Sequence, residues 1–147
     1  MRDQLGIANR TETVTVLSIS PFEEDHLSLQ DILGHFGWVS FKADGHSAAL
    51  AVLRQHDISV ILCECDLKPG TWIDVLDHIK DLPHPPSLVV TSRLADDRLW
   101  AEALNMGAWD VLAKPFDRTD VLRVVKGAWQ HWHDKIQLPV GMARAAS

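Results

Sequence analysis

VILCECDLKPGTW, residues 60–72, sets a run of apolar side chains directly against two acids. The apolar run ends at Glu64, and Asp66 follows two positions later, before Pro69 and Gly70 interrupt the chain. A short apolar run bounded by turn residues is typical of a fully buried strand. The sequence therefore predicts a strand from Ile58 to Glu64 that ends on a carboxylate.

The same alternation of a short apolar strand with an amphipathic helix continues on both sides of this stretch. Thr71 with Asp74 predicts one helix start, and Ser20 as N-cap with Pro21 at the first helical position predicts another. Gly37 and Gly107 are expected to end helices. The predicted strands are 14–19, 38–43, 58–64, 87–91 and 109–112, and the predicted helices are 21–36, 46–55, 72–80, 95–106 and 117–135. Five β–α pairs in this order predict an α/β fold with one doubly wound, five-stranded parallel sheet.

Length and composition bound the function classes. The chain has 147 residues, enough for one domain, which we expect at residues 13–135 between tails at 1–12 and 136–147. The formal net charge is -6 and no basic cluster stands out, which argues against nucleic-acid binding. No segment approaches the roughly 20 apolar residues of a membrane span, and no signal-peptide run is present. We therefore expect a cytoplasmic protein that does not contact a membrane.

The residues most often used as metal ligands give a weak signal. Cys63 and Cys65 lie two positions apart in an apparent strand, so their side chains point to the same face, where a disulfide between them is geometrically poor. No second cysteine pair completes a zinc site. Buried free thiols in a reducing compartment are the expected state. The eight histidines are scattered, so we expect them at the surface and predict no metal site.

Chemistry is expected where the strands end, because ligands of open parallel α/β sheets bind beyond the carboxyl ends of the strands. An acid, a hydroxyl and a cation follow the third, fourth and fifth strands: Glu64, Thr91 and Lys114. These three side chains are therefore expected to converge at one edge of the sheet.

Two stretches resemble the receiver domains of two-component response regulators. They are LVVTS at residues 88–92 and GAWDVLAKPF at residues 107–116, which is similar to the G-A-x-D-x-L-x-K-P-F pattern of that family. The resemblance covers about Thr13 to Trp132 and implies the flavodoxin-like, CheY-like (βα)5 fold. It also implies a non-enzymatic signalling module of a phosphorelay that contacts a protein partner such as a histidine kinase. A cis Lys114–Pro115 bond is a further implication of the resemblance.

The family binds Mg²⁺ through acids after the first strand and accepts phosphate on an aspartate after the third. A hydroxyl after the fourth strand and the lysine then contact the phosphoryl group, and here Thr91 and Lys114 match. The other positions depart from the pattern. They are Glu64 at the acceptor, Ser20 and Pro21 at the acidic pair, and Val111 at the switch aromatic.

These departures predict a degenerate pseudo-receiver. Mg²⁺ requires oxygen ligands and usually takes one or two carboxylates, whereas Pro21 offers no side-chain oxygen. Glu64 is one methylene longer than aspartate, which moves its carboxylate by roughly 1 Å, a shift that can cost on the order of 100-fold in transfer. The longer acid can instead reach Lys114 directly. We therefore expect no phosphorylation and no cofactor.

Two alternatives stay open from the residues alone. One is a phosphate-accepting receiver in which Glu23 and Glu24 supply Mg²⁺ ligands and Glu64 or Asp66 is the acceptor. The acidic run 23–25 is, however, well explained as stabilisation of a helix N-terminus. The other alternative is a flavin- or ligand-binding flavodoxin-like protein, although the loop after the first strand contains no glycine for a phosphate.

Six tryptophans are many for a chain of this length. The resemblance implies pairing through the fourth helix, fifth strand and fifth helix, which carry Trp100, Trp109, Trp129 and Trp132. The last helix has two apolar stripes, of which core packing requires one. Because aromatic side chains concentrate at interfaces, we expect a homodimer or partner contact on this face.

Overall fold

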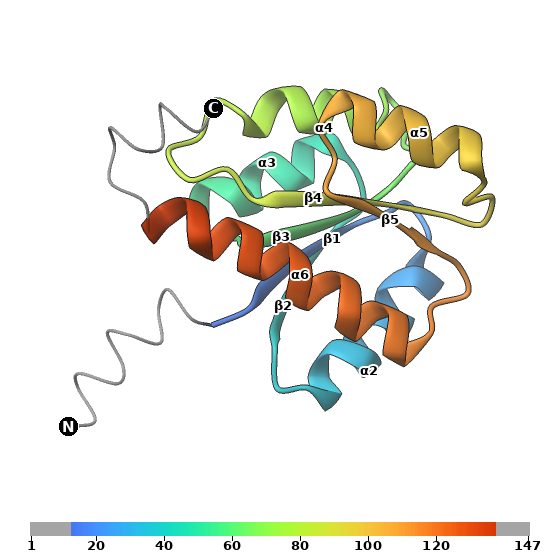
Figure 1. The fold of residues 1–147 in the computed structure, drawn as a ribbon, viewed down its shortest axis with the longest axis horizontal. Coiled ribbons are helices and arrows are strands. Elements are labelled where there is room, and N and C mark those ends of the chain that lie inside the picture. Colours follow the sequence, from blue (N-terminus) through green and yellow to red (C-terminus); the bar gives the residue numbers. More distant parts are fainter. Residues whose placement is uncertain (1–12, 138–147) are drawn as a thin grey trace.

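Five short strands lie parallel in one sheet, in the order β2-β1-β3-β4-β5. The computed structural model describes residues 13–137, so both expected tails lie outside the described residues except for Ile136 and Gln137. The strands are β1 (Thr15–Ile19), β2 (Val39–Ala43), β3 (Val60–Glu64), β4 (Ser87–Ser92) and β5 (Asp110–Ala113). The helices are α2 (Glu23–His35), α3 (His46–Gln55), α4 (Trp72–Ile79), α5 (Asp97–Met106) and α6 (Arg118–Gln137). The predicted fold class is confirmed (Figure 1).

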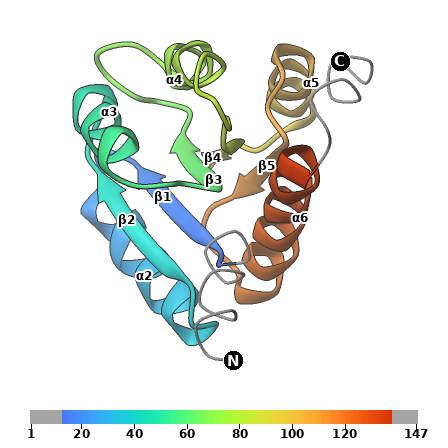
Figure 2. The same cartoon turned by 90° about the vertical axis from the view of Figure 1, so that its left-hand side faces the viewer.

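The helices cover both faces of the sheet and enclose two cores. Helices α2 and α6 lie on one face, and α3, α4 and α5 lie on the other (Figure 2). Strand residues alternate between the two cores: Ile61 and Cys63 of β3 belong to the α3–α5 side, whereas Val60 and Leu62 belong to the α2–α6 side. By the same alternation Glu64 points to the α2–α6 side. Both faces are thus buried, as a parallel sheet requires.

Most predicted helix boundaries are confirmed by local chemistry. Thr71 and Asp74 form a reciprocal capping box at the start of α4. Gly37 and Gly107 follow the last turns of α2 and α5 with φ angles of 72° and 110°. This left-handed conformation favours glycine because it has no Cβ.

The predicted start of α2 is wrong. The helix begins at Glu23 with Phe22 at the cap position, and no side chain caps it. Ser20 lies outside the helix, where its hydroxyl accepts a hydrogen bond from the Phe22 backbone N–H at 3.0 Å. The hydroxyl also donates to Asp25 Oδ2 at 2.7 Å. Ser20 therefore binds the side chain of Asp25 and does not cap the helix.

Helix α6 buries most of both apolar stripes. Val121, Val124, Val125 and Ala128 are all buried in the α2–α6 core, and Trp129 is half-buried. The helix packs across β3, β4 and β5, so the expectation that a whole stripe would be left for a partner is wrong. Within residues 13–137, no helix combines the length and apolar character that a membrane crossing requires.

Candidate functional site

Three strands deliver side chains to one edge of the sheet. Glu64 is the last residue of β3 and pairs in register with Thr91 of β4. The backbone N–H of Lys114, just beyond β5, donates to the carbonyl of Ser92 at 2.9 Å. The parallel register therefore brings the ends of β3, β4 and β5 to the same level, as the sequence predicted.

The ammonium group of Lys114 lies between two carboxylates. Its Nζ contacts Glu64 Oε1 directly and donates to Asp25 Oδ2 at 2.7 Å. The three side chains are only 5–7% exposed. A direct contact between Glu64 and Lys114 was predicted, whereas the contact with Asp25 was not. We call Lys114, Glu64 and Asp25 the buried charge cluster.

Further hydrogen-bond donors contact both carboxylates. Glu64 Oε2 accepts the backbone N–H of Asp66 at 2.8 Å and the Cys65 thiol at 3.4 Å. Asp25 Oδ2 accepts the Ser20 hydroxyl in addition to Lys114. Asp25 also lies in the first turn of α2, where the helix dipole favours a negative charge. The protein itself thus supplies the groups that compensate both charges.

The pKa of Lys114 reflects two opposing effects. Burial lowers the pKa of a lysine, because it disfavours the charged form. The hydrogen bonds and charges of Asp25 and Glu64 outweigh that effect and raise the pKa of Lys114 above its ordinary value. Lys114 is therefore an ammonium ion at neutral pH, and the cluster carries two negative charges against one positive.

Glu23 and Glu24 do not belong to this cluster. Glu23 pairs with Lys42 at 3.1 Å, and Glu24 pairs with Arg93 at 3.0 Å, with more than half of each side chain exposed. Their contribution of metal oxygens, which one alternative required, is not supported by this placement. Asp66, the alternative acceptor, is exposed in the loop after β3.

Asp25 is the site residue that sequence reasoning missed. The acidic run was interpreted as helix-end stabilisation alone, which holds for the exposed Glu23 and Glu24 but not for Asp25. A signal was present, because Asp25 precedes the buried Leu29 by four positions and Ile32 by seven. An acid that extends the buried stripe of a helix must find a partner in the interior.

The remaining expected site residues differ in how far their side chains are exposed to solvent. Thr91 is buried beside Glu64, Ser20 is buried against Asp25, and Pro21 is exposed. Val111 is buried in the α3–α5 core and lies on the opposite side of β5 from Leu112. An aliphatic residue thus fills the position at which the family resemblance places an aromatic switch.

One histidine contradicts the expectation of surface histidines. His26 is buried, its Nε2 donates to the Ser20 carbonyl at 2.8 Å, and its Nδ1 shares a hydrogen bond with the Ser18 hydroxyl at 3.0 Å. It thereby ties α2 to the loop after β1 that carries Ser20. The cysteines follow the prediction, since both thiols are free, with Cys63 buried and Cys65 half-buried.

The side chains at this edge of the sheet do not form a suitable set of ligands for Mg²⁺. The Lys114 ammonium occupies the position between Asp25 and Glu64 at which a cation would be held, and it would repel a second one. Ser20 and Pro21 add no carboxylate, and near-octahedral oxygen coordination requires more free oxygens than this set offers. Residues 13–137 also contain no group of three His, Cys, Asp or Glu side chains placed to hold a metal.

A pocket of about 310 Å³ opens above the cluster. Phe22 and Leu94 line it and are both exposed, and the Phe22 ring centroid lies 5.1 Å from Lys114 Nζ, within range of a cation–π contact. The Arg93–Glu24 ion pair joins the loop after β4 to α2 beside this opening. Two apolar side chains therefore share the lining of this pocket with Asp66, Ser92 and Arg93.

The four expected interface tryptophans separate into two groups. Trp100 and Trp109 are 46% and 38% exposed, whereas Trp129 is half-buried and Trp132 is buried. Trp109 stacks on His131 of α6 at 4.5 Å between ring centroids. Of the four tryptophans, Trp100 and Trp109 therefore offer substantial surface near α5, β5 and α6, where Leu104 and Met106 are also exposed.

The parallel five-stranded sheet and the lysine–carboxylate cluster at its edge define a doubly wound α/β protein with a strand-end site. The family model for the response regulator receiver domain matches residues 24–126. The chain therefore belongs to the response-regulator receiver family and carries a receiver domain of two-component signalling. Such domains are in general signalling modules, and the predicted family is confirmed. The Lys114–Pro115 bond is cis, as the resemblance implied.

Curated relatives are similar over the receiver portion. The chain is 27% identical over 95 residues to a protein-glutamate methylesterase/protein-glutamine glutaminase of Desulfotalea psychrophila, covering 62% of this chain and 26% of the relative. It is 28% identical over 102 residues to the sensory transduction protein LytR of Staphylococcus saprophyticus, covering 69% and 39%. It is 30% identical over 106 residues to the transcriptional regulatory protein ZraR of Escherichia coli, covering 71% and 24%. The chain thus spans a quarter to two-fifths of these relatives.

Solved receiver domains share the fold. The receiver domain of an HD domain-containing protein from Pseudomonas fluorescens superposes with a TM-score of 0.74 at 22% identity, covering 83% of this chain and 98% of that chain. A putative Luxo repressor receiver domain from Vibrio parahaemolyticus gives 0.76 at 17% identity, covering 86% and 99%. The beryllofluoride-activated NtrC4 receiver domain dimer gives 0.73 at 23% identity, covering 80% and 98%.

Proposed function

We propose that this receiver domain is a pseudo-receiver, which signals through protein–protein contacts without taking up a phosphoryl group. It has no enzymatic activity and needs no bound metal. The observation that carries the proposal is the position of the Lys114 ammonium between the buried carboxylates of Glu64 and Asp25.

Each requirement of phosphoryl transfer meets an obstacle in this cluster. The carboxylate at the acceptor position must attack phosphorus, but Glu64 Oε1 contacts Lys114 and Oε2 accepts two hydrogen bonds. Phosphoryl transfer also depends on metal ions that neutralise developing charge, and Mg²⁺ lacks ligands here. A transferred phosphoryl group would bring further negative charge to a cluster that already has an excess of one.

The cluster supports a second aspect of the proposal. By the family pattern, the lysine after the fifth strand contacts the negative charge of the phosphoryl group once the acceptor is modified. Here the carboxylates of Glu64 and Asp25 supply that charge permanently. We therefore infer that the domain stays in one signalling conformation, which is regulated by the availability of a partner and not by phosphate.

Intact-mass measurement tests the proposal directly. The full chain is incubated with acetyl phosphate or phosphoramidate and Mg²⁺ and quenched in acid, with a receiver that carries aspartate at its acceptor position treated in parallel. We expect no mass gain in this chain and a gain of one phosphoryl group in the parallel sample. A gain of one phosphoryl group in this chain overturns the proposal.

The phosphate-accepting alternative makes a distinguishable prediction for two acids. Asp66 is exposed and lines the pocket above Glu64, so a phosphodonor can reach it. If phosphorylation is found, Glu64→Gln and Asp66→Asn identify the acceptor, because only the substitution at the acceptor abolishes the mass gain. Flavin binding is less well supported, since the loop after β1 has no glycine and Ser20 is engaged with Asp25. A colourless purified protein argues against it.

We propose that the partner contact uses the face of α5, β5 and α6, where Trp100, Leu104 and Trp109 are exposed. A second copy of the chain or another signalling protein such as a histidine kinase is the expected partner. The NtrC4 receiver domain is a dimer in its solved structure, which supports pairing here. The two free thiols favour action in a reducing compartment such as the cytoplasm.

A further inference from the structure

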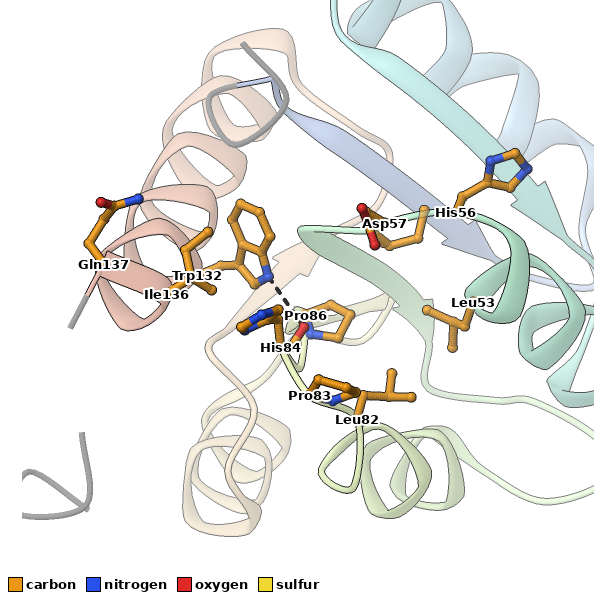
Figure 3. A pocket seen from close by; sticks show the side chains of 11 residues that line it. Leu53, His56, Asp57, Leu82, Pro83, His84, Pro86, Trp132, Ile136 and Gln137 are labelled. Atoms are coloured by element: carbon orange, nitrogen blue, oxygen red, sulfur yellow. Dashed lines mark hydrogen bonds between the residues drawn. The ribbon is translucent and has the colours of Figure 1, made fainter. Parts of the chain in front are cut away.

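A second opening lies at the end of the sheet opposite the buried charge cluster. It has a volume of about 470 Å³ and lies between the end of α3, the loop that precedes β4 and the last turns of α6. Its apolar lining includes Leu53, Ile58, Leu82, Pro86, Trp132 and Ile136. Figure 3 shows Trp132 and Ile136 of α6 facing the loop residues across this space. We call this opening the amino-edge groove, because the strands begin there.

The amino-edge groove has a defined wall. The Trp132 indole N–H donates to the carbonyl of His84 at 3.4 Å, which ties α6 to the loop before β4 (Figure 3). Trp132 is buried and Pro86 is buried, so the floor is fixed by the core. The groove therefore has a largely apolar lining on a fixed floor, with His56, Asp57 and His84 as polar members.

The chain leaves α6 at the lip of this groove. Gln137, the last residue of the helix, is itself one of the lining residues. Pro139 follows two positions later, and a proline disfavours the helical conformation of the residue before it, here Leu138. The sequence therefore disfavours continuation of the helix beyond Gln137, at a point beside the groove.

The sequence after Gln137 suits an apolar groove. Residues 138–142 read Leu-Pro-Val-Gly-Met, which lie outside the described residues. In an extended segment, Leu138, Val140 and Met142 would share one face, because alternate side chains point the same way. Five extended residues span about 17 Å. The short connection also gives the segment a high effective concentration at the groove.

We propose that residues 138–142 dock in the amino-edge groove, with Leu138 and Val140 against Trp132 and the loop before β4. The occupant is thus a segment of this chain itself. Docking would fix the direction in which the polypeptide departs from the receiver domain. It would do so at the edge remote from Lys114, so the inference is independent of the proposed absence of phosphorylation.

Isotope-edited NMR of the full chain tests this docking. The indole resonance of Trp132 is assigned by its loss in Trp132→Phe. We expect nuclear Overhauser contacts from the methyl groups of Leu138 and Val140 to the Trp132 indole. The contacts should disappear, and the indole resonance should shift, in a Leu138→Asp/Val140→Asp variant. The matched control Ala143→Asp/Ala145→Asp adds the same charge further along the chain and should leave both unchanged.

Two results would overturn the inference. One is the absence of these contacts in the unmodified chain, a measurement that does not depend on any variant folding. The other is that the contacts arise only between labelled and unlabelled molecules in a mixed sample, which would identify a second copy as the occupant. Contacts within one molecule that are lost in the double variant support the proposed docking.

Discussion

Lys114 Nζ lies 2.7 Å from Asp25 Oδ2, although 89 positions separate the two residues in the sequence. The contact joins the first turn of α2 to the residue that follows β5, across the strand ends of the sheet. Because Lys114 also contacts Glu64, one ammonium group is shared by two buried carboxylates. The site therefore links three distant segments of the chain through one network of buried charges.

Removal of the shared cation should cost more than removal of one anion. Lys114→Met leaves Asp25 and Glu64 as two uncompensated buried carboxylates, and we expect a loss of about 3–5 kcal/mol in the free energy of unfolding. Glu64→Gln keeps the Lys114–Asp25 pair and should cost about 1–3 kcal/mol. Urea denaturation of both variants measures the difference. Equal losses, or the reverse order, would show that Lys114 is not shared as described.

Asp25 should matter to stability in a way that its neighbour Glu24 does not. Asp25→Asn weakens the contacts with both Lys114 and Ser20, and we expect a loss of about 1–3 kcal/mol. Glu24→Gln removes only an exposed ion pair with Arg93, so its effect should stay within about 1 kcal/mol. Both variants remove one negative charge from the same helix turn, which makes them a matched pair in chemical denaturation. Equal effects would contradict the assignment of Asp25 to the cluster.

The raised pKa of Lys114 predicts a loss of stability at alkaline pH. A group whose pKa is higher in the folded than in the unfolded protein contributes its full stabilisation below its unfolded value, about 10.4 for lysine. The contribution disappears as the pH rises through the folded value. The unfolding free energy of the unmodified chain should therefore fall more steeply above about pH 10.4 than that of Lys114→Met. Parallel slopes in thermal or urea unfolding across this range would contradict the shift.

The two thiols should differ in reactivity. Burial, aided by the charge of Glu64, raises the pKa of the Cys63 thiol, and the side chain is fully enclosed in the α3–α5 core. Cys65 also has a raised pKa, again chiefly through burial, but it is half-buried and lines the pocket above Glu64. Iodoacetamide should therefore modify Cys65 slowly in the native protein and leave Cys63 intact until urea unfolds the chain. Peptide mass mapping identifies the modified residue, and labelling of native Cys63 would contradict the packing.

The exposed face of α5, β5 and α6 makes a prediction about association. Trp100→Glu places a charge on the surface without disturbing the core, because Trp100 is 46% exposed. If the chain pairs through this face, light scattering after size exclusion should show a lower mass for this variant than for the unmodified chain. Leu27→Glu is the control, since Leu27 is 59% exposed but lies on α2. A mass that falls equally in both variants, or in neither, would count against this face.

The tryptophans show why burial limits inference from sequence. Trp129 and Trp132 occur at regular spacing on α6 and were expected on the partner face together with Trp100 and Trp109. The structure turns Trp132 toward the loop before β4 and packs Trp129 against the α2–α6 core. Helical periodicity identifies which side chains share a face but does not identify what that face meets. The number of neighbours around α6 is a property of the whole fold.

By itself, the sequence determined the five β–α pairs, the parallel sheet and the convergence of Glu64, Thr91 and Lys114 at one edge. These follow from local patterns, because strand and helix periodicity, a capping box at Thr71 and glycines at helix ends act over a few residues. Tertiary structure alone decided that Asp25 joins the cluster, that Ser20 binds Asp25 in place of capping α2, and that His26 is buried. Such choices depend on which groups lose their water when distant segments meet, since a buried carboxylate must find a cation or donors nearby.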